Sequence, residues 1–453
     1  MVASPATLPA ADTDAAATNA ALRNAEVVAL DRANVFHSWS AQKALKPMAI
    51  AGGSGSKVWD HDGNTFLDFS SQLVNTNIGH QHPKVIAAIA RQATRLATVA
   101  PAAANHVRST AAAKILSHAP STMEKVFFTN GGADANENAI RMARLHTGRD
   151  KVLSRYRSYH GNTGSAIAAT GDWRRIPNEY SRGHIHVFGP YLYRSEFWAE
   201  TPEQETERAL HHLRRVIQAE GPQSVAALLL ETVPGTAGIL VPTPGYLEGV
   251  RALCDEYGII MILDEVMAGF GRTGDWFAFD AYNVTPDLIT FAKGVNSGYI
   301  PVGGVIISGE IAATFDERVF PGGLTYSGHP IAAASIVASI EAFEEEDIVG
   351  NAARIGRDHL EPGLNALAEK HSVIGEVRGR GVFWALELVN DRTSRTPVSA
   401  NYMGRLKAEL LRLNLLPFIA DNRLHVVPPA VVTAKEVAQA LAIYDQALSA
   451  VGS

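Results

Sequence analysis

One lysine in this 453-residue chain stands where a reactive amine is expected. Lys293 comes directly after the apolar run Leu288–Ala292. Burial behind such a run disfavours the charged amine and lowers its pKa, which makes the lysine a good nucleophile for a carbonyl group. Lys293 is therefore a candidate to form a Schiff base. A strand-end lysine that simply reaches solvent would give the same local pattern.

An acidic residue follows a second apolar run. Asp264 comes directly after Ile259–Leu263, so its charge needs a cationic partner. The protonated ring nitrogen of a bound cofactor would supply that partner, and the pair would keep the ring an electron sink. A helix cap or an ordinary ion pair would explain Asp264 equally. Val266 lies two residues further on and could pack under a flat ring or serve as a core residue.

Other motifs could hold the remaining parts of such a cofactor. Gly131-Gly132-Ala133 opens a helix, where free amides and the helix dipole favour a phosphate, although such a pair can be only a tight turn. In Tyr159-His160-Gly161 the tyrosine offers a flat ring for stacking, with ordinary packing as the alternative. Glu231 could bond the oxygen side of the cofactor ring or orient the loop after it. The glycine-rich loop around Thr325 could complete a phosphate site.

The order of elements explains how these residues could meet. From about residue 80 to 330, apolar runs alternate with helical patterns, which is typical of a parallel sheet covered by helices. Ligands bind such sheets at the carboxyl ends of the strands. A glycine pair, an aromatic ring, two acids and a lysine would reach one edge, and together they favour pyridoxal 5'-phosphate (PLP) bound to Lys293. The runs are Lys125–Thr129, Lys151–Ser154, Val225–Leu230, Ile259–Leu263 and Leu288–Ala292.

The length and the flanking segments predict two domains around one site. Residues 1–25 are expected to form a flexible arm and residues 80–330 the large domain. A small domain is expected from both chain ends, residues 26–79 and 331–453. The first of these parts contains a hairpin pattern over Lys57–Phe69, and the second contains a strand group over Val373–Val389.

Composition narrows the function classes. The net charge of −6 gives no basic surface for nucleic acid or an anionic membrane, and the apolar runs are far too short to span a bilayer. No metal site is expected, because the sixteen histidines form no H-x-x-x-H or H-E-x-x-H motif. The single cysteine, Cys254, fits a reducing cytoplasm, as it would also fit a thiol-poor secreted protein.

The stretch I-L-D-E-V…G-F-G-R-T-G…P-D-L-I-T-F-A-K-G, with the residues above, resembles the class III (omega) aminotransferases of the fold-type I PLP enzymes. The resemblance runs from about Trp59 to the C-terminus. It implies an α/β fold, with a mainly parallel seven-stranded sheet in the large domain and a small α+β domain from both chain ends. It also implies a homodimer with shared sites, or a tetramer.

The resemblance assigns roles to single residues. Lys293 would be the Schiff-base lysine and proton carrier, and Asp264 would bind the pyridine nitrogen. Thr325 would reach the phosphate of the neighbouring subunit. Many relatives have serine where this chain has Ala133, so one phosphate hydroxyl is missing here. The remaining cofactor contacts that it implies are Gly132, Ala133, Tyr159, His160, Glu231 and Val266.

Where related subgroups bind the acid group of their substrates, this chain has other residues. In relatives that use oxo acids, the arginine that binds the carboxylate aligns with Phe418 or His425 of this chain. The arginine of the 4-aminobutyrate enzymes aligns with Asn162. The glutamine of the decarboxylases falls at Leu73. Arg423 shares a strand face with His425 and remains a candidate for a carboxylate, or an exposed arginine with no such role.

These features predict a ping-pong transamination, from an omega-amino acid or amine to an oxo acid, with pyruvate ahead of 2-oxoglutarate as acceptor. A PLP-dependent decarboxylase or aminomutase would share every cofactor residue, and a non-catalytic binding module of the same fold would need none. If Arg423 does not bind the acceptor carboxylate, Arg174 is the next candidate.

Overall fold

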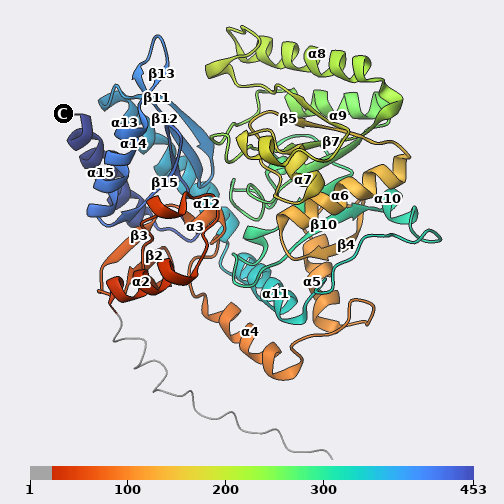
Figure 1. Ribbon diagram of the computed structural model, residues 1–453, viewed down its shortest axis with the longest axis horizontal. Helices are drawn as coiled ribbons and strands as arrows, with labels where there is room; N and C mark the ends of the chain where they lie inside the picture. The colour runs from red at the N-terminus through yellow and green to blue at the C-terminus, as the bar shows by residue number, and fades with distance from the viewer. Residues whose placement is uncertain (1–22, 453) are drawn as a thin grey trace, which may run out of the picture.

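The computed structural model describes residues 23–452, which form two lobes (Figure 1). The arm expected over residues 1–25 lies almost wholly outside this range, and its last two residues open helix α2. No helix within the described range is long and apolar enough to cross a membrane. The longer helices are α2 (Asn24–Asn34), α4 (Pro83–Arg95), α5 (His106–Leu116), α6 (Gly132–Thr147), α8 (Pro202–Glu220), α9 (Tyr246–Tyr257), α11 (Pro330–Glu345), α12 (Ile348–Ile355), α13 (Glu361–Lys370), α14 (Ala400–Arg412) and α15 (Ala434–Gly452).

The large lobe is built on a seven-stranded sheet in the order β4-β10-β9-β8-β7-β5-β6. Only β10 runs antiparallel to its neighbours. All five apolar runs predicted from the sequence lie in this sheet, and β7 is buried over its whole length. The strands are β4 (Met123–Thr129), β5 (Lys151–Arg155), β6 (His184–Val187), β7 (Val225–Glu231), β8 (Ile260–Asp264), β9 (Leu288–Phe291) and β10 (Gly303–Ser308).

Helix α6 lies across one face of this sheet. Ala135, Ala139 and Ala143 recur every four residues on one side of the helix, and all three are fully buried. They pack against sheet residues such as Leu229 and Ile262. Because alanine side chains are small, the helix axis comes close to the sheet, and the polar side chains on the same face reach the strands.

The small lobe joins segments from both ends of the chain (Figure 1). The predicted hairpin is confirmed as the antiparallel pair β2 (Lys57–Asp60) and β3 (Thr65–Asp68). Strand β14 (Leu415–Leu416) pairs in parallel with β3 and so adds a C-terminal strand to the N-terminal sheet. That sheet also contains β1 (Ile50–Ser54). The second sheet contains β11 (Ile374–Arg380), β12 (Phe383–Asp391), β13 (Thr396–Pro397), β15 (Phe418–Ala420) and β16 (Arg423–Val426).

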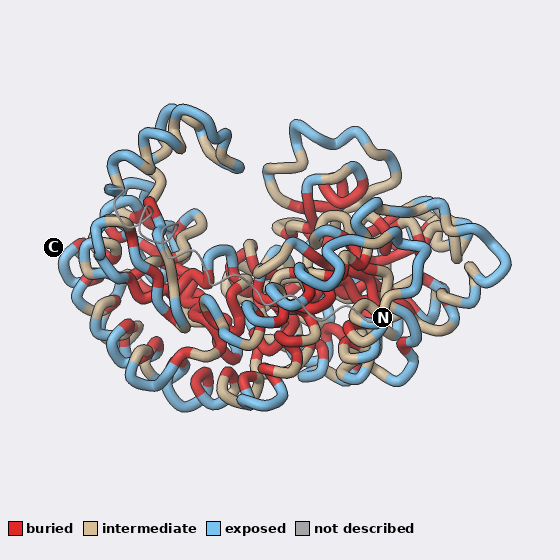
Figure 2. The backbone as a smooth tube through the Cα atoms, turned by 90° about the horizontal axis from the view of Figure 1, so that it is seen from below, coloured by how far each residue is buried: buried red, intermediate tan, exposed pale blue. Residues whose placement is uncertain are grey.

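The two lobes share buried contacts. Figure 2 shows buried segments running through the interior of the molecule, with exposed segments around its rim. Arg272, fully buried after β8, donates from Nη2 to Asn77 Oδ1 (2.5 Å) and from Nη1 to the carbonyl of Pro428 (2.5 Å). The boundary expected at residues 330 and 331 falls at the start of α11, which packs against α4 and α5.

Candidate active site

A cavity of about 350 Å³ opens at the carboxyl ends of the central strands. Nearly all cofactor contacts expected from the sequence line it, and Thr325 does not. Its polar walls include Asn130, Asn136, His160, Glu231, Thr236, Asp264, Lys293 and Asn296. Leu73, Val266, Met267, Ile300, Pro301 and Val302 are among its apolar walls. The site is thus a mostly apolar pocket with a few converging polar groups, which is the usual form of a cofactor site.

Lys293 enters the cavity from the end of β9. Its backbone is left-handed, with φ of 45°, a conformation that costs energy for a residue with a side chain. Burial lowers the pKa of the Lys293 amine, although the nearby carboxylates of Asp264 and Glu231 favour its charged form. The lowered pKa increases the fraction of neutral amine, the form that reacts with a carbonyl.

Asp264 ends β8 beside Lys293, and its side chain is 3% exposed. Oδ1 accepts the backbone amide of Val266 (3.0 Å), and Oδ2 accepts His160 Nδ1 (2.8 Å) and Asn136 Nδ2 (2.7 Å). Hydrogen bonds to the charged form of a buried carboxyl favour that form. Asp264 can therefore remain a carboxylate inside the protein and pair with a cationic ring nitrogen.

The start of α6 has the geometry of a phosphate site. The first amides of a helix have no partner within the helix, and the two residues that open α6, Gly132 and Ala133, line the cavity. A Cβ on Gly132 would lie 2.8 Å from Val266 Cγ1, and a Cβ on Gly161, with φ of +136°, would lie 2.5 Å from Ala133 Cβ. Glycine fits at both positions because the Val266 side chain occupies the space beside Gly132, and Ala133 occupies the space beside Gly161.

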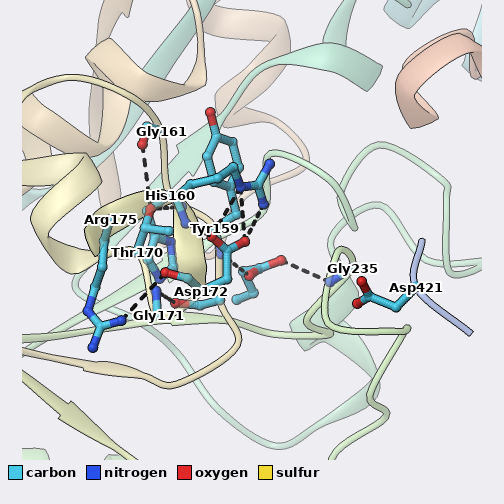
Figure 3. Close-up of polar contacts among 12 residues, drawn as sticks. Tyr159, His160, Gly161, Thr170, Gly171, Asp172, Arg175, Gly235 and Asp421 are labelled. Atoms are coloured by element: carbon cyan, nitrogen blue, oxygen red, sulfur yellow. Dashed lines mark hydrogen bonds and ion pairs between the residues drawn. The ribbon is translucent and has the colours of Figure 1, made fainter. Parts of the chain in front are cut away.

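Tyr159 forms a side wall of the cavity, and an arginine stacks on its ring. The guanidinium carbon of Arg174 lies 3.7 Å from the centroid of the Tyr159 ring. Asp172 fixes that guanidinium through Nε, at 3.0 and 3.1 Å, and through Nη2. Trp39 meets the same tyrosine ring edge-on, with centroids 6.3 Å apart. Figure 3 shows Tyr159 beside the Asp172 turn. The orientation of the ring is thus set by contacts outside the cavity.

Glu231 orients the chain around the cavity. Its Oε1 accepts the backbone amide of Tyr159 (3.1 Å), and its Oε2 accepts the amide of Gly235 (2.9 Å), the second bond being drawn in Figure 3. Burial raises the pKa of Glu231, and these two amide bonds oppose that effect. Of the two roles that the sequence left open, orientation of the following loop is the one with observed hydrogen bonds.

The residues expected to bind substrate differ in their surroundings. Leu73 lines the cavity and is half exposed, whereas the neighbouring Gln72 donates to Asp68 Oδ2 (3.1 Å). Arg423 and His425 are not among the lining residues. Burial lowers the pKa of His425 to about 3, so its ring is neutral and cannot replace an arginine charge. The Arg423 guanidinium pairs with an exposed aspartate, Asp421, at 2.5 Å.

Thr325 lies outside the cavity of its own chain. Thr325 is exposed, on the loop between α10 (Gly309–Ala313) and α11. Two contacts hold this loop to the large lobe: Ser327 Oγ donates to the carbonyl of Phe128 (2.7 Å), and Arg108 Nε donates to the carbonyl of Gly328 (2.8 Å). The loop is therefore presented outward in a defined position.

Several residues around the site were not identified from the sequence. Asn136 and Thr290 are buried next to Asp264, and Thr236 lines the cavity. Asn136 carries a usable signal, because it lies four residues after Gly132 and therefore on the same helix face. Thr290 and Thr236 carry none, since a threonine in a strand or a loop is common in any protein.

These features define a PLP-dependent enzyme of fold type I: a lysine and an aspartate at neighbouring strand ends, a glycine-rich helix start and a flanking tyrosine. A sequence profile of the family Aminotransferase class-III matches residues 39–448, and the chain belongs to that family. It is an aminotransferase that depends on PLP, and the non-catalytic alternative does not apply. The fold and cofactor predicted from the sequence are confirmed.

Similar proteins of known structure and function share the whole length. The taurine:2-oxoglutarate aminotransferase from Bifidobacterium kashiwanohense, solved in complex with PLP and glutamate, is 41% identical, with a TM-score of 0.92 and coverage of 95% of this chain and 98% of that chain. An (S)-enantioselective omega-transaminase from Thermomicrobium roseum is 35% identical, with a TM-score of 0.91 and coverage of 95% and 100%. The taurine–pyruvate aminotransferase of Bilophila wadsworthia is 32% identical, over 94% of this chain and 98% of that protein.

Glu265, next to Asp264, is a buried acid that faces away from the chemistry. It accepts the hydroxyl of Thr232 on Oε1 and the backbone amide of Ala278 on Oε2 (2.8 Å). Burial raises the pKa of Glu265 to about 7. The folded protein therefore binds this proton more tightly than the unfolded chain, where the pKa is about 4.3.

The raised pKa of Glu265 predicts a pH-dependent stability. Binding of this proton stabilises the folded protein. The stabilisation is complete below the pKa that Glu265 has in the unfolded chain, and it is lost as pH rises through about 7. Glu265→Gln should remove this dependence, because glutamine can keep both partners. Calorimetry of the apoenzyme should be carried out from pH 4.5 to 8. As pH rises, the free energy of unfolding of the variant should increase relative to that of the wild type by up to about 3 kcal/mol. Exposed Glu310 provides the control, Glu310→Gln, and parallel profiles for all three proteins would contradict the assignment.

Proposed function

We propose that the enzyme transfers an amino group from an omega-amino acid or simple amine to an oxo acid, in two half-reactions at one site. The observation that carries this proposal is the position of Lys293, whose amine has a lowered pKa and enters a cavity beside two buried carboxylates, Asp264 and Glu231. In this proposal Lys293 Nζ is the covalent attachment point of the cofactor and, once free, the group that moves the proton.

The residues around the cavity match the parts of PLP. The first amides of α6, at Gly132 and Ala133, would bind the phosphate, and Tyr159 and Val266 would lie on the two faces of the ring. Asp264 would hold a proton at the ring nitrogen. When bound, PLP supplies an electron sink for negative charge on the substrate carbon next to the amine.

The chain's own groups then perform the remaining work. Lys293 Nζ takes the proton from the substrate carbon and delivers it on the other side of the reacting group, acting as general base and then general acid. The apolar walls exclude water from the reacting carbon. The carbonyl product, an aldehyde or a ketone according to the donor, leaves, and an oxo acid enters and undergoes the same steps in reverse order.

The donor we propose is a small amino acid whose acid group is remote from its amine. Two of the similar proteins are named for taurine, an amine of this type with a sulfonate. Leu73 in place of a glutamine, with Gln72 bound to Asp68, favours transamination over decarboxylation. We propose pyruvate as acceptor, because Arg174 and Arg423 each already pair with an aspartate and a single carboxylate is easier to accommodate than the two of 2-oxoglutarate.

We further propose a homodimer in which Thr325 of each chain contacts the cofactor phosphate of the other. Its exposure outside its own cavity and the anchored loop that carries it support this arrangement. We also propose a cytoplasmic location, for which the single, buried thiol of Cys254 is suitable.

Lys293→Ala should separate cofactor binding from catalysis. The phosphate and ring contacts remain, so PLP should still bind, whereas turnover should fall by at least about 10³-fold because the proton carrier and the attachment point are lost together. A small amine added to the solution should restore part of the rate. Lys151→Ala, which removes a lysine at the opposite end of the sheet paired with Glu220, is the control and should stay active. Wild-type turnover in Lys293→Ala would refute the assignment.

The shared site can be tested with mixed dimers. If Thr325 serves the partner, a Lys293→Ala chain combined with a Thr325→Ala chain forms one site with both lesions and one site with neither. Turnover should therefore recover after subunit exchange, toward half of the wild-type value per dimer. Mixing each variant with itself is the control. Verified hybrids without recovery would show that Thr325 acts within its own chain or has no role.

Recognition of the acceptor carboxylate can be assigned to one arginine. To bind the acceptor carboxylate, Arg423 would have to leave Asp421 and turn toward the cavity. If it does so, Arg423→Ala removes a charged hydrogen bond of about 1.5–3 kcal/mol and should raise the KM for the oxo acid by about 10-fold or more. The half-reaction with an amine lacking a carboxylate should hardly change. Arg412→Ala, an exposed arginine paired with Glu409, is the control. Equal effects on both half-reactions would make Arg423 structural, and an effect seen only in Arg174→Ala would move the carboxylate to Arg174.

A further inference from the structure

Asp264 depends on side chains that come from other elements of the fold. Its Oδ2 accepts two hydrogen bonds, from His160 Nδ1 (2.8 Å) and from Asn136 Nδ2 (2.7 Å). Asn136 is 1% exposed and His160 is 2% exposed, so water does not compete for these bonds. The remaining side-chain oxygen, Oδ1, accepts one backbone amide, from Val266 (3.0 Å), and keeps room for a further donor from the cavity side.

The orientation of the Asn136 amide follows from its partners. Its Nδ2 faces two acceptors, Asp264 Oδ2 and the carbonyl of His160 (2.8 Å). Its Oδ1 accepts the hydroxyl of Thr290 (2.7 Å). Thr290 is fully buried. A flipped amide would place an oxygen against a carboxylate, so only the observed orientation satisfies all three partners.

The four residues connect the separate parts of the site. Asn136 is one helical turn after Gly132, at the phosphate end of α6. Thr290 lies on β9, in register with Asp264 on β8 and three residues before Lys293. His160 belongs to the loop that carries Tyr159. The chain Thr290–Asn136–Asp264 therefore links the phosphate-binding helix, the strand of the acid and the strand of the lysine.

We propose that Asn136 is a positioning residue, which keeps the Asp264 carboxylate charged and aimed at the cofactor ring nitrogen, and that Thr290 sets the Asn136 amide for this task. The inference rests on the proposed role of Asp264. Two side-chain donors on Oδ2 stabilise the carboxylate in a buried place and prevent rotation of its plane. His160 supplies only one of these two donors, so removal of the Asn136 amide would leave Oδ2 with a single side-chain donor.

Four substitutions test the proposal. Asn136→Leu removes the amide but keeps a side chain of similar volume. Thr290→Val removes the hydroxyl but keeps the shape of the side chain, and Thr290→Ser keeps the hydroxyl. Asn351→Leu is the control, because Asn351 is an internal amide that donates to the carbonyls of Ala430 and Val432 in the small lobe, away from the cavity. For each holoenzyme we would measure the PLP dissociation constant, the pH titration of its visible absorbance, the single-turnover rate with the amine, and the thermal midpoint.

Asn136→Leu should weaken PLP binding and slow the single turnover, each by about 10- to 100-fold, the effect of one charged hydrogen bond. The pH midpoint of the visible absorbance should rise, because a poorly held ring-nitrogen proton removes positive charge from the conjugated system. Thr290→Val should show the same changes to a smaller degree, and Thr290→Ser should match the wild type. Asn351→Leu should lower only the thermal midpoint.

The outcomes separate this inference from the function itself. A lower thermal midpoint in Asn136→Leu, with an unchanged absorbance midpoint and single-turnover rate, would make Asn136 merely structural and overturn the proposal. If Asn136→Leu does not fold, the contrast between Thr290→Val and Thr290→Ser decides, and equal behaviour of the two overturns it. A normal rate in Asp264→Asn would overturn the role of Asp264 as well, whereas a slow Asp264→Asn beside a normal Asn136→Leu would overturn this inference alone.

Discussion

The need to keep a carboxylate charged inside the protein is the constraint on which the rest of the site depends. Asp264 is almost fully buried, and burying a charge without hydrogen-bonding partners is costly. The protein surrounds it with a backbone amide, His160 and Asn136. Lys293 then faces a fixed negative charge in a pocket that otherwise lowers the pKa of its amine.

The packing of α6 on the large sheet follows from the same constraint. Alanines on the inner helix face bring the helix close enough for Asn136 to reach Asp264 across the sheet edge. Gly161 lets the Tyr159 loop meet the helix start at Ala133 without a clash, and Gly132 leaves space for the Val266 side chain. One helix thus lines the cavity at its first turn and supplies a donor for the acid at its second turn.

The substrate side of the cavity is built differently from the cofactor side. Its walls come from the N-terminal segment at Leu73 and from the segments after β7 and before β10, and they are mainly apolar. Arg174 and Arg423 do not line the cavity and are each paired with an aspartate, and His425 is neutral through burial. Cofactor binding and substrate choice are therefore separable in this chain, since different elements supply them.

The sequence by itself determined the parallel sheet, the functional residue that follows each of its predicted strands, and the identity of the cofactor. Apolar runs show a buried strand directly, and the residue after each run must lie at the ligand-binding edge, as it does for Asp264 and Lys293. Tertiary structure alone decided which polar groups meet. The Asn136–Thr290 contact joins residues 154 positions apart, and the burial that makes His425 neutral comes from neighbouring strands. Such contacts depend on how elements pack in space, and local residue patterns carry no record of that packing.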